Sequence, residues 1–103
     1  MAEVSIGNID DFPEGVLTRV EADGTPLCVV RVGERVHAIC DDCPHAEASL
    51  SEGEFLPDEM EVECPLHGSA FNLDTGEPSA PPATEPVEVF PVSIRDGDVV
   101  VEV

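Results

Sequence analysis

The sequence contains no lysine, no tryptophan and no tyrosine, and its only four basic residues are arginines. Against these arginines stand 23 aspartates and glutamates, which give the 103 residues a formal net charge of −19 at neutral pH. A chain this negative is repelled by the phosphates of nucleic acids and by anionic membrane surfaces. The composition therefore argues against nucleic acid and membrane partners, and it favours high solubility or docking to a basic protein surface.

Long helices and membrane-spanning segments are also missing. Eight glycines and ten prolines divide the chain so finely that its longest stretch without either is residues 34–43. That stretch leaves no room for an ordinary helix of three turns. No run of 18 apolar residues occurs, and residues 1–11 lack the basic start and the apolar stretch of an export signal. We therefore expect a soluble, cytoplasmic protein.

Short segments rich in β-branched residues alternate with turn signals such as Asp-Gly, Pro-Asp and Thr-Gly. The expected strands cover residues 3–6, 16–22, 26–32, 35–40, 60–63, 87–90, 92–95 and 99–103. This pattern predicts a single all-β domain over residues 1–103, folded as a small antiparallel sandwich or barrel. Its core is light because four phenylalanines are the only aromatic residues, and such a core gains stability from a bound metal.

Two short segments carry the residues with metal-binding chemistry. Cys43-Pro44-His45 and Cys64-Pro65-Leu66-His67 each supply one thiolate and one imidazole, in the pattern C-x-H-x18-C-x2-H. Two cysteines and two histidines from two loops are the ligands of a 2Fe-2S centre in which histidines replace two cysteines on one iron. The sequence thus resembles the Rieske family. The HAI strand before the first loop, HGSAFNLDTGE after the second and the proline-rich SAPPATEP segment extend the resemblance over most of the chain.

The resemblance implies one Rieske-type 2Fe-2S cluster, bound by Cys43, His45, Cys64 and His67 in a cluster-binding subdomain over about residues 41–86. Neighbouring residues are expected to support the ligands in different ways. The prolines stiffen the loops, the glycine permits an unusual backbone conformation or a close approach, and the serine can donate a hydrogen bond to a cluster sulfide. These supporting residues are Pro44, Pro65, Gly68, Ser69, Phe71 and, in the loop that covers the cluster, Pro82.

The branch of the family follows from two further positions. Ala48 and Leu66 stand at or near places where respiratory-complex Rieske proteins carry an extra disulfide-bonded cysteine pair, so the chain resembles the soluble ferredoxins instead. The resemblance then implies a monomeric electron carrier that is not itself an enzyme. It would pass single electrons from a flavin-dependent NAD(P)H reductase to a terminal oxygenase, such as a ring-hydroxylating dioxygenase. A small apolar rim is expected around its transient docking patch, formed by Leu50, Leu66, Pro82 and Ala83.

The ligand mixture also bears on the reduction potential. With two neutral imidazoles the oxidised cluster has no net charge, so it accepts an electron more easily than a cluster held by four thiolates. Potentials of this class accordingly span about −150 to +300 mV, against about −400 mV for plant-type ferredoxins. Phe71 stands where high-potential members carry a tyrosine hydroxyl, and Asp41, Asp42 and Glu47 place negative charge near the site. We therefore predict a potential in the lower half of that range.

Two other interpretations use the same residues. Cys40, Cys43, Cys64 and His67 also spell C-x2-C-x20-C-x2-H, a spacing that suits tetrahedral zinc and would make the chain a zinc-stabilised interaction module. The chain could instead be the small Rieske-like subunit of a larger reductase such as nitrite reductase. Such subunits often lack the cluster ligands, so the presence of all four argues against this alternative.

The remaining cysteines and the third histidine are expected to be structural. Cys28 lies in an apolar run, and Cys40 ends the next expected strand. A tight turn at Gly33-Glu34 would pair Cys28 with Ile39 or Ala38 and not with Cys40 itself, which argues against a disulfide between the two cysteines. His37, in the middle of its strand, is expected to be a half-buried sheet residue.

Overall fold

The computed structural model describes residues 3–42, 48–66, 68–79 and 85–103. Within these ranges the chain forms ten strands, two 3₁₀ helices of three residues and no α-helix, and no helix there is long and apolar enough to cross a membrane. The 3₁₀ helices are η1 (Ile9–Asp11) and η2 (Leu50–Glu52). The strands are β1 (Glu3–Asn8), β2 (Thr18–Ala22), β3 (Thr25–Val32), β4 (Arg35–Cys40), β5 (Glu54–Leu56), β6 (Glu61–Glu63), β7 (Ala70–Asn72), β8 (Val89–Phe90), β9 (Val92–Arg95) and β10 (Asp98–Glu102).

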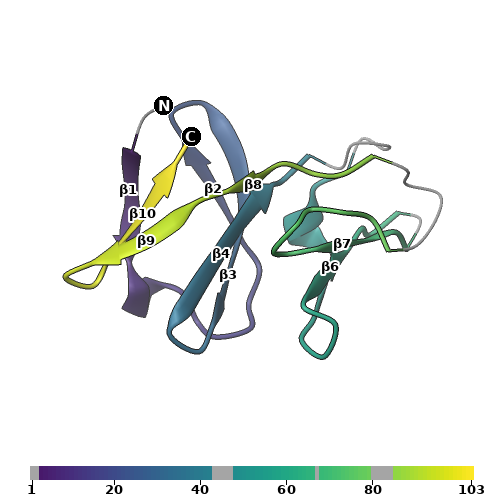
Figure 1. Cartoon of the computed structure of the whole chain (residues 1–103), viewed down its shortest axis with the longest axis horizontal. Coiled ribbons are helices and arrows are strands. Elements are labelled where there is room, and N and C mark those ends of the chain that lie inside the picture. The colour runs from purple at the N-terminus through teal and green to yellow at the C-terminus, as the bar shows by residue number, and fades with distance from the viewer. Residues whose placement is uncertain (1–2, 43–47, 67, 80–84) are drawn as a thin grey trace.

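The strands form three antiparallel sheets arranged as layers (Figure 1). The outer sheet has the order β1-β10-β9, the middle sheet β2-β3-β4-β8, and the small sheet β5-β6-β7. Figure 1 places the small sheet at one end of the long axis, beyond the middle sheet. The predicted fold class, a small antiparallel sandwich or barrel, is confirmed.

The middle sheet is buried on both faces, and this explains the uninterrupted apolar run in β3. Side chains alternate across a strand, so Leu27 and Val29 face the outer sheet while Cys28 and Val30 face the small sheet. All four residues are fully buried. Two apolar cores therefore share one sheet, and the core on the small-sheet side lies next to the predicted metal site.

Tight turns position the strands as the sequence indicates. Asp23-Gly24 joins β2 to β3 and Asp96-Gly97 joins β9 to β10, each with positive φ at both residues. Such turns match the twist of the paired strands and favour Asp-Gly sequences.

All eight expected strand segments contain a strand, but β5 and β7 were not predicted. Each has three residues, which is too short for an alternating pattern to appear in the sequence. Both pair with β6, the strand that ends one residue before Cys64. They lie within the range 41–86 of the predicted cluster-binding subdomain, whose boundaries stay a prediction.

Candidate metal centre

The first predicted ligand loop begins just after β4, and its described ends are held together. Asp42 and Ser49 form an antiparallel bridge. The backbone N–H of Leu50 donates to the carbonyl oxygen of Asp41 over 2.7 Å. The described residues on the two sides of residues 43–47 therefore lie next to each other.

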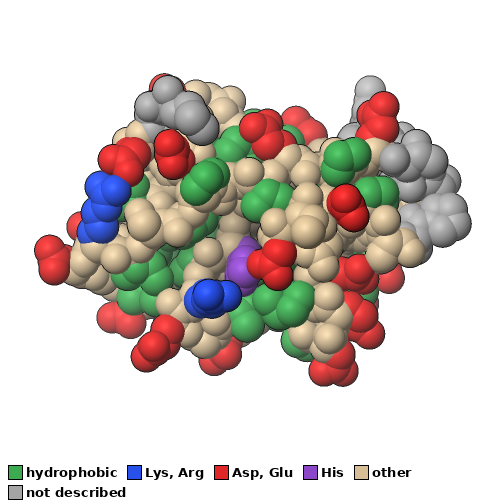
Figure 2. All heavy atoms as spheres, viewed as in Figure 1, with side chains coloured by type: hydrophobic (Ala, Val, Ile, Leu, Met, Phe, Trp, Pro, Cys, Tyr) green, Lys and Arg blue, Asp and Glu red, His purple; other side chains and the backbone are tan. Residues whose placement is uncertain are grey.

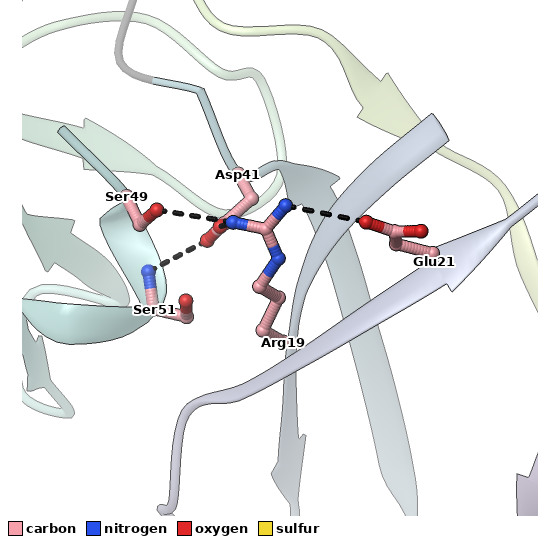
Figure 3. Close-up of polar contacts among 5 residues, drawn as sticks. All are labelled: Arg19, Glu21, Asp41, Ser49 and Ser51. Carbon is pink, nitrogen blue, oxygen red and sulfur yellow. Dashed lines mark hydrogen bonds and ion pairs between the residues drawn. The ribbon is translucent and has the colours of Figure 1, made fainter. Parts of the chain in front are cut away.

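A buried carboxylate lies at the base of this loop (Figure 3). Asp41 is 0% exposed, and its Oδ1 accepts a hydrogen bond from the Ser51 N–H over 2.7 Å. Its Oδ2 accepts from Nη1 of Arg19, on β2, over 3.3 Å, and the same nitrogen donates to Oγ of Ser49 over 3.2 Å. The sequence analysis placed the negative charge of Asp41 near the site, and the structure adds that Arg19 pairs with it. Arg19 was missed because no local motif links residues 22 positions apart.

The second ligand loop is a tight turn between β6 and β7. The backbone N–H of Cys64 donates to the carbonyl of Ser69 over 2.6 Å, and the N–H of Gly68 donates to the carbonyl of Cys64 over 3.3 Å. Gly68 has a φ of +74°, a conformation that glycine adopts without steric cost. Gly68 therefore has an unusual backbone conformation of the kind that the sequence analysis expected, and its support of the cluster stays a prediction.

The start of the proline-rich segment lies against the same small sheet. Phe71, on β7, forms a bridge with Pro78, and the backbone N–H of Ser79 donates to the carbonyl of Ala70 over 2.8 Å. Further along, the Val87 N–H donates to the carbonyl of Gly76 over 2.8 Å. The described residues on the two sides of the segment are thus bonded to β7 and to the turn that follows it.

The described parts of both ligand loops meet in one apolar core. Cys64 is 1% exposed and belongs to the same buried group as Leu50 and Phe71, with Ala48 packed against it. Leu50 follows the first loop and Phe71 follows the second. The fold therefore brings together two segments that lie well apart in the sequence.

The structure describes half of the ten predicted site residues. Cys64, Ser69 and Phe71 are buried, whereas Pro65 and Gly68 are exposed. Within the described residues no group of three His, Cys, Asp or Glu side chains suits a metal ion. The complete ligand set therefore stays a prediction, because the other predicted residues, Cys43, Pro44, His45, His67 and Pro82, lie outside the described ranges.

The expected apolar rim needs one correction. Leu50 is 0% exposed because it anchors η2 in the core, so it cannot contribute to a docking patch. Leu66 is 57% exposed, as a rim residue must be. The other two rim residues, Pro82 and Ala83, lie outside the described ranges.

The cysteines outside the ligand loops are structural, as expected. Cys28 is fully buried and lies opposite Ile39, while Cys40 lies opposite Leu27, and both thiols are free. Burial raises the pKa of Cys28 to about 12, with a smaller contribution from the negative charge of Asp41. Burial also raises the pKa of Cys40. Neither residue therefore has the low thiol pKa of a reactive cysteine.

His37 lies where β4 faces the turn after β7. Its side chain is 13% exposed, and its Nδ1 is 3.8 Å from Oδ1 of Asp74. Within the described structure its buried Nε2 has no hydrogen-bond partner. Both residues line a groove of about 360 Å³, and Figure 2 shows the histidine, in purple, in a hollow of this face. The expectation of a half-buried sheet residue is confirmed.

Comparison with known proteins identifies the family. The model of the Rieske [2Fe-2S] domain matches residues 2–91. The chain belongs to the Rieske [2Fe-2S] family. Its sequence is 46% identical over 92 residues to ferredoxin CarAc from Metapseudomonas resinovorans, covering 88% of this chain and 84% of that protein.

Two solved structures extend the Rieske comparison. The ferredoxin of carbazole 1,9a-dioxygenase from Nocardioides aromaticivorans IC177 has a TM-score of 0.94 and 38% identity, covering 98% of this chain and 97% of that one. The complex of reduced oxygenase and oxidized ferredoxin in carbazole 1,9a-dioxygenase contains a chain with a TM-score of 0.87 and 42% identity, covering 96% of this chain and 91% of that one. Two structures described as nitrite reductase small subunits, 22% and 24% identical, show the fold alone.

These findings confirm a Rieske-type ferredoxin, an electron carrier and not an enzyme, with one 2Fe-2S cluster. The zinc interpretation is therefore wrong. The described residues fit the cluster, because the Cys64 thiol is buried, free of any disulfide and placed at a tight turn. Gly68 in the same turn is exposed, and no described atom lies within 4 Å of the position that a Cβ would take there. When bound, the cluster supplies a site that takes up and releases one electron at a time.

Proposed function

We propose that this Rieske ferredoxin passes single electrons from a flavin-dependent NAD(P)H reductase to a terminal oxygenase, such as a ring-hydroxylating dioxygenase. In this proposal Cys43, His45, Cys64 and His67 bind the cluster. The observation that carries it is the likeness, over 96% of the chain, to the ferredoxin in the oxygenase–ferredoxin complex of carbazole 1,9a-dioxygenase. The chain acts as a cytoplasmic monomer of one domain over residues 1–103, with the cluster held by residues 41–86.

Exposure near the second ligand loop supports docking at this end of the molecule. Leu66, two positions after the buried Cys64, is 57% exposed, and Pro65 beside it is exposed as well. An apolar side chain that leaves water on contact strengthens a small, transient electron-transfer interface. The charge of −19 attracts a basic partner surface before contact and increases the rate of encounter.

The first experiment is electron paramagnetic resonance of anaerobically purified protein after reduction with dithionite. We expect a rhombic signal with the low average g value of histidine-ligated 2Fe-2S centres, and two irons per chain. Cys64→Ser is expected to lose the signal, whereas Cys40→Ser serves as the matched control and keeps it. A silent wild-type sample that contains zinc would contradict the proposal.

The second experiment measures transfer to a partner. Reduced ferredoxin is mixed in a stopped-flow instrument with the oxygenase component of a carbazole 1,9a-dioxygenase, and its reoxidation is followed by visible absorption. Leu66→Gln is expected to lower the second-order rate constant without changing the reduction potential. Ile94→Gln, which makes the same change at a 38% exposed position on β9, is the control. Equal rates for both variants and wild type would exclude docking through Leu66.

A further inference from the structure

Arg19 and Asp41 connect the base of the first ligand loop to the middle sheet. The backbone N–H, the carbonyl and both carboxylate oxygens of Asp41 all form hydrogen bonds. Its N–H donates to the carbonyl of Pro26 over 3.1 Å, its carbonyl accepts from Leu50, and its carboxylate accepts from Ser51 and Arg19. Leu50 and Ser51 belong to η2, which follows the loop. Asp41 therefore joins the chain that enters the loop to the chain that leaves it.

Arg19 makes a parallel connection from β2. One of its nitrogens, Nη1, donates to Asp41 before the loop and to Ser49 after the loop (Figure 3). Its other terminal nitrogen, Nη2, lies 3.4 Å from Oε1 of Glu21, whose side chain is 67% exposed. The guanidinium thus contacts Asp41 and Ser49, the residues on the two sides of residues 42–48, and connects both to a strand of the middle sheet.

The charge pattern indicates that this pair has a specific role. Among the described residues, Asp41 is the only charged residue that is buried. The whole sequence has four cationic side chains and 23 acidic ones, so cations are scarce. Burying a carboxylate is costly unless a cation and hydrogen bonds compensate it, and removing one partner leaves an uncompensated buried charge. A stabilising contact alone could be made by neutral side chains at lower cost.

We propose that Arg19 and Asp41 are positioning residues for the 2Fe-2S cluster. By tying together the two ends of the first ligand loop, the pair determines how long the protein retains the cluster and how uniform the cluster's environment is. The inference rests on the proposed ligands Cys43 and His45, which lie between these ends in the sequence. It adds to the family assignment two residues that are not ligands.

The test measures cluster loss in the full-length holoprotein. Visible absorbance is followed at fixed temperature in excess iron chelator, and iron content is measured at the end. We expect Arg19→Gln and Asp41→Asn each to accelerate cluster loss about tenfold, the effect of one lost hydrogen bond to a charged group. Arg19→Lys keeps the charge and is expected to restore part of the retention.

The double variant separates a coupled pair from two independent contacts. Arg19→Gln alone leaves the carboxylate of Asp41 buried without its cation, and Asp41→Asn removes that charge. The variant with both substitutions should therefore keep the cluster longer than Arg19→Gln alone. Additive acceleration would overturn the proposed coupling.

A spectroscopic measurement separates positioning from general destabilisation. In the reduced variants the paramagnetic resonance lines should broaden, while far-ultraviolet circular dichroism at the same temperature matches wild type. Two control variants should change neither the rate of cluster loss nor the width of the resonance lines. They are Glu21→Gln, at the exposed partner of Arg19, and Arg95→Gln, where the arginine pairs with Glu3 in the outer sheet.

The possible outcomes distinguish this inference from the proposed function. If wild type shows the rhombic signal and both Arg19→Gln and Asp41→Asn lose the cluster at the wild-type rate, the inference fails and the proposed function stands. If wild type itself lacks the signal, the proposed function fails as well. Faster loss in Glu21→Gln or Arg95→Gln, equal to that in Arg19→Gln, would also overturn the inference.

Discussion

Nδ1 of His37 lies 3.8 Å from Oδ1 of Asp74, and this contact joins the middle sheet to the turn after β7. Burial lowers the pKa of His37 below its ordinary 6.5. The negative charge of Asp74 partly opposes this shift, and the positive charge of Arg35 adds to it. The folded protein therefore favours the neutral imidazole, although a carboxylate lies nearby.

This shift predicts a loss of stability in mild acid. Because the pKa is lower in the folded state, the unfolded chain takes up the proton first, and the free energy of unfolding decreases as pH falls below about 6.5. His37→Gln should remove this share of the pH dependence, and Asp74→Asn should enlarge it. Melting temperatures by circular dichroism, measured stepwise downward from pH 7.5, provide the comparison. Parallel profiles for wild type and His37→Gln would contradict the prediction.

The cysteine register predicts two inert thiols. Cys28 faces Ile39, one residue out of register with Cys40, and burial raises the pKa of both thiols. We expect iodoacetamide at pH 8 to modify Cys28 only after unfolding, as measured by mass spectrometry. Cys40→Ser should retain two irons per chain, because Cys40 is not among the four proposed ligands. Rapid alkylation of Cys28 in the folded protein would show that this core opens.

Two glycines near the site should respond differently to alanine. A Cβ at Gly53 would stand 1.8 Å from the carbonyl oxygen of Glu63, so Gly53→Ala must push β5 away from β6. We expect Gly53→Ala to lower the free energy of unfolding by about 3 kcal/mol, as severe overpacking does. An added Cβ at Gly68 would contact no described neighbour. Because the backbone there is left-handed, Gly68→Ala should lower the free energy of unfolding by about 1 to 2 kcal/mol. The free energies of unfolding are measured by chemical denaturation, and equal decreases in the two variants would contradict this steric argument.

The reduction potential should lie in the lower half of about −150 to +300 mV. Phe71 is fully buried in the same core as Cys64 and has no hydroxyl to donate to a ligating sulfur. Phe71→Tyr supplies such a donor and should raise the potential, because a hydrogen bond to sulfur stabilises the added electron. Phe90→Tyr, in the other core, is the control. Voltammetry measures all three proteins, and a wild-type value near the top of the range would refute the prediction.

The acidic surface predicts salt-sensitive reduction by the reductase. With a net charge of −19, encounter with a basic partner is faster at low ionic strength and is screened as salt rises. Stopped-flow reduction should slow by about tenfold or more between 20 and 500 mM salt, roughly the range over which screening becomes strong. A constant rate would show that charge does not steer the encounter.

Prediction from the sequence succeeded where the signal was local. The apolar run of β3 and the Asp-Gly turns were readable from neighbouring residues, and the spacing of the two Cys/His loops indicated the family. The contacts of Arg19 were not readable, because they depend on β2 and β4 flanking β3 in the middle sheet, which brings Arg19 near the residue that follows β4. Leu50 was misplaced for a similar reason. Its burial depends on η2 folding back onto the core, and its sequence neighbours do not indicate this.

Because β3 is buried on both faces, residues cannot be deleted from either side of the middle sheet without exposing apolar side chains. Deleting residues 41–86 would remove the covering layer from Cys28, Val30 and Ile39 and leave an apolar sheet face open to water. Such an exposed face makes a fragment associate with itself or with other proteins. The residues proposed to hold the cluster therefore also cover one apolar face of the middle sheet, and a shortened protein needs other residues to cover that face.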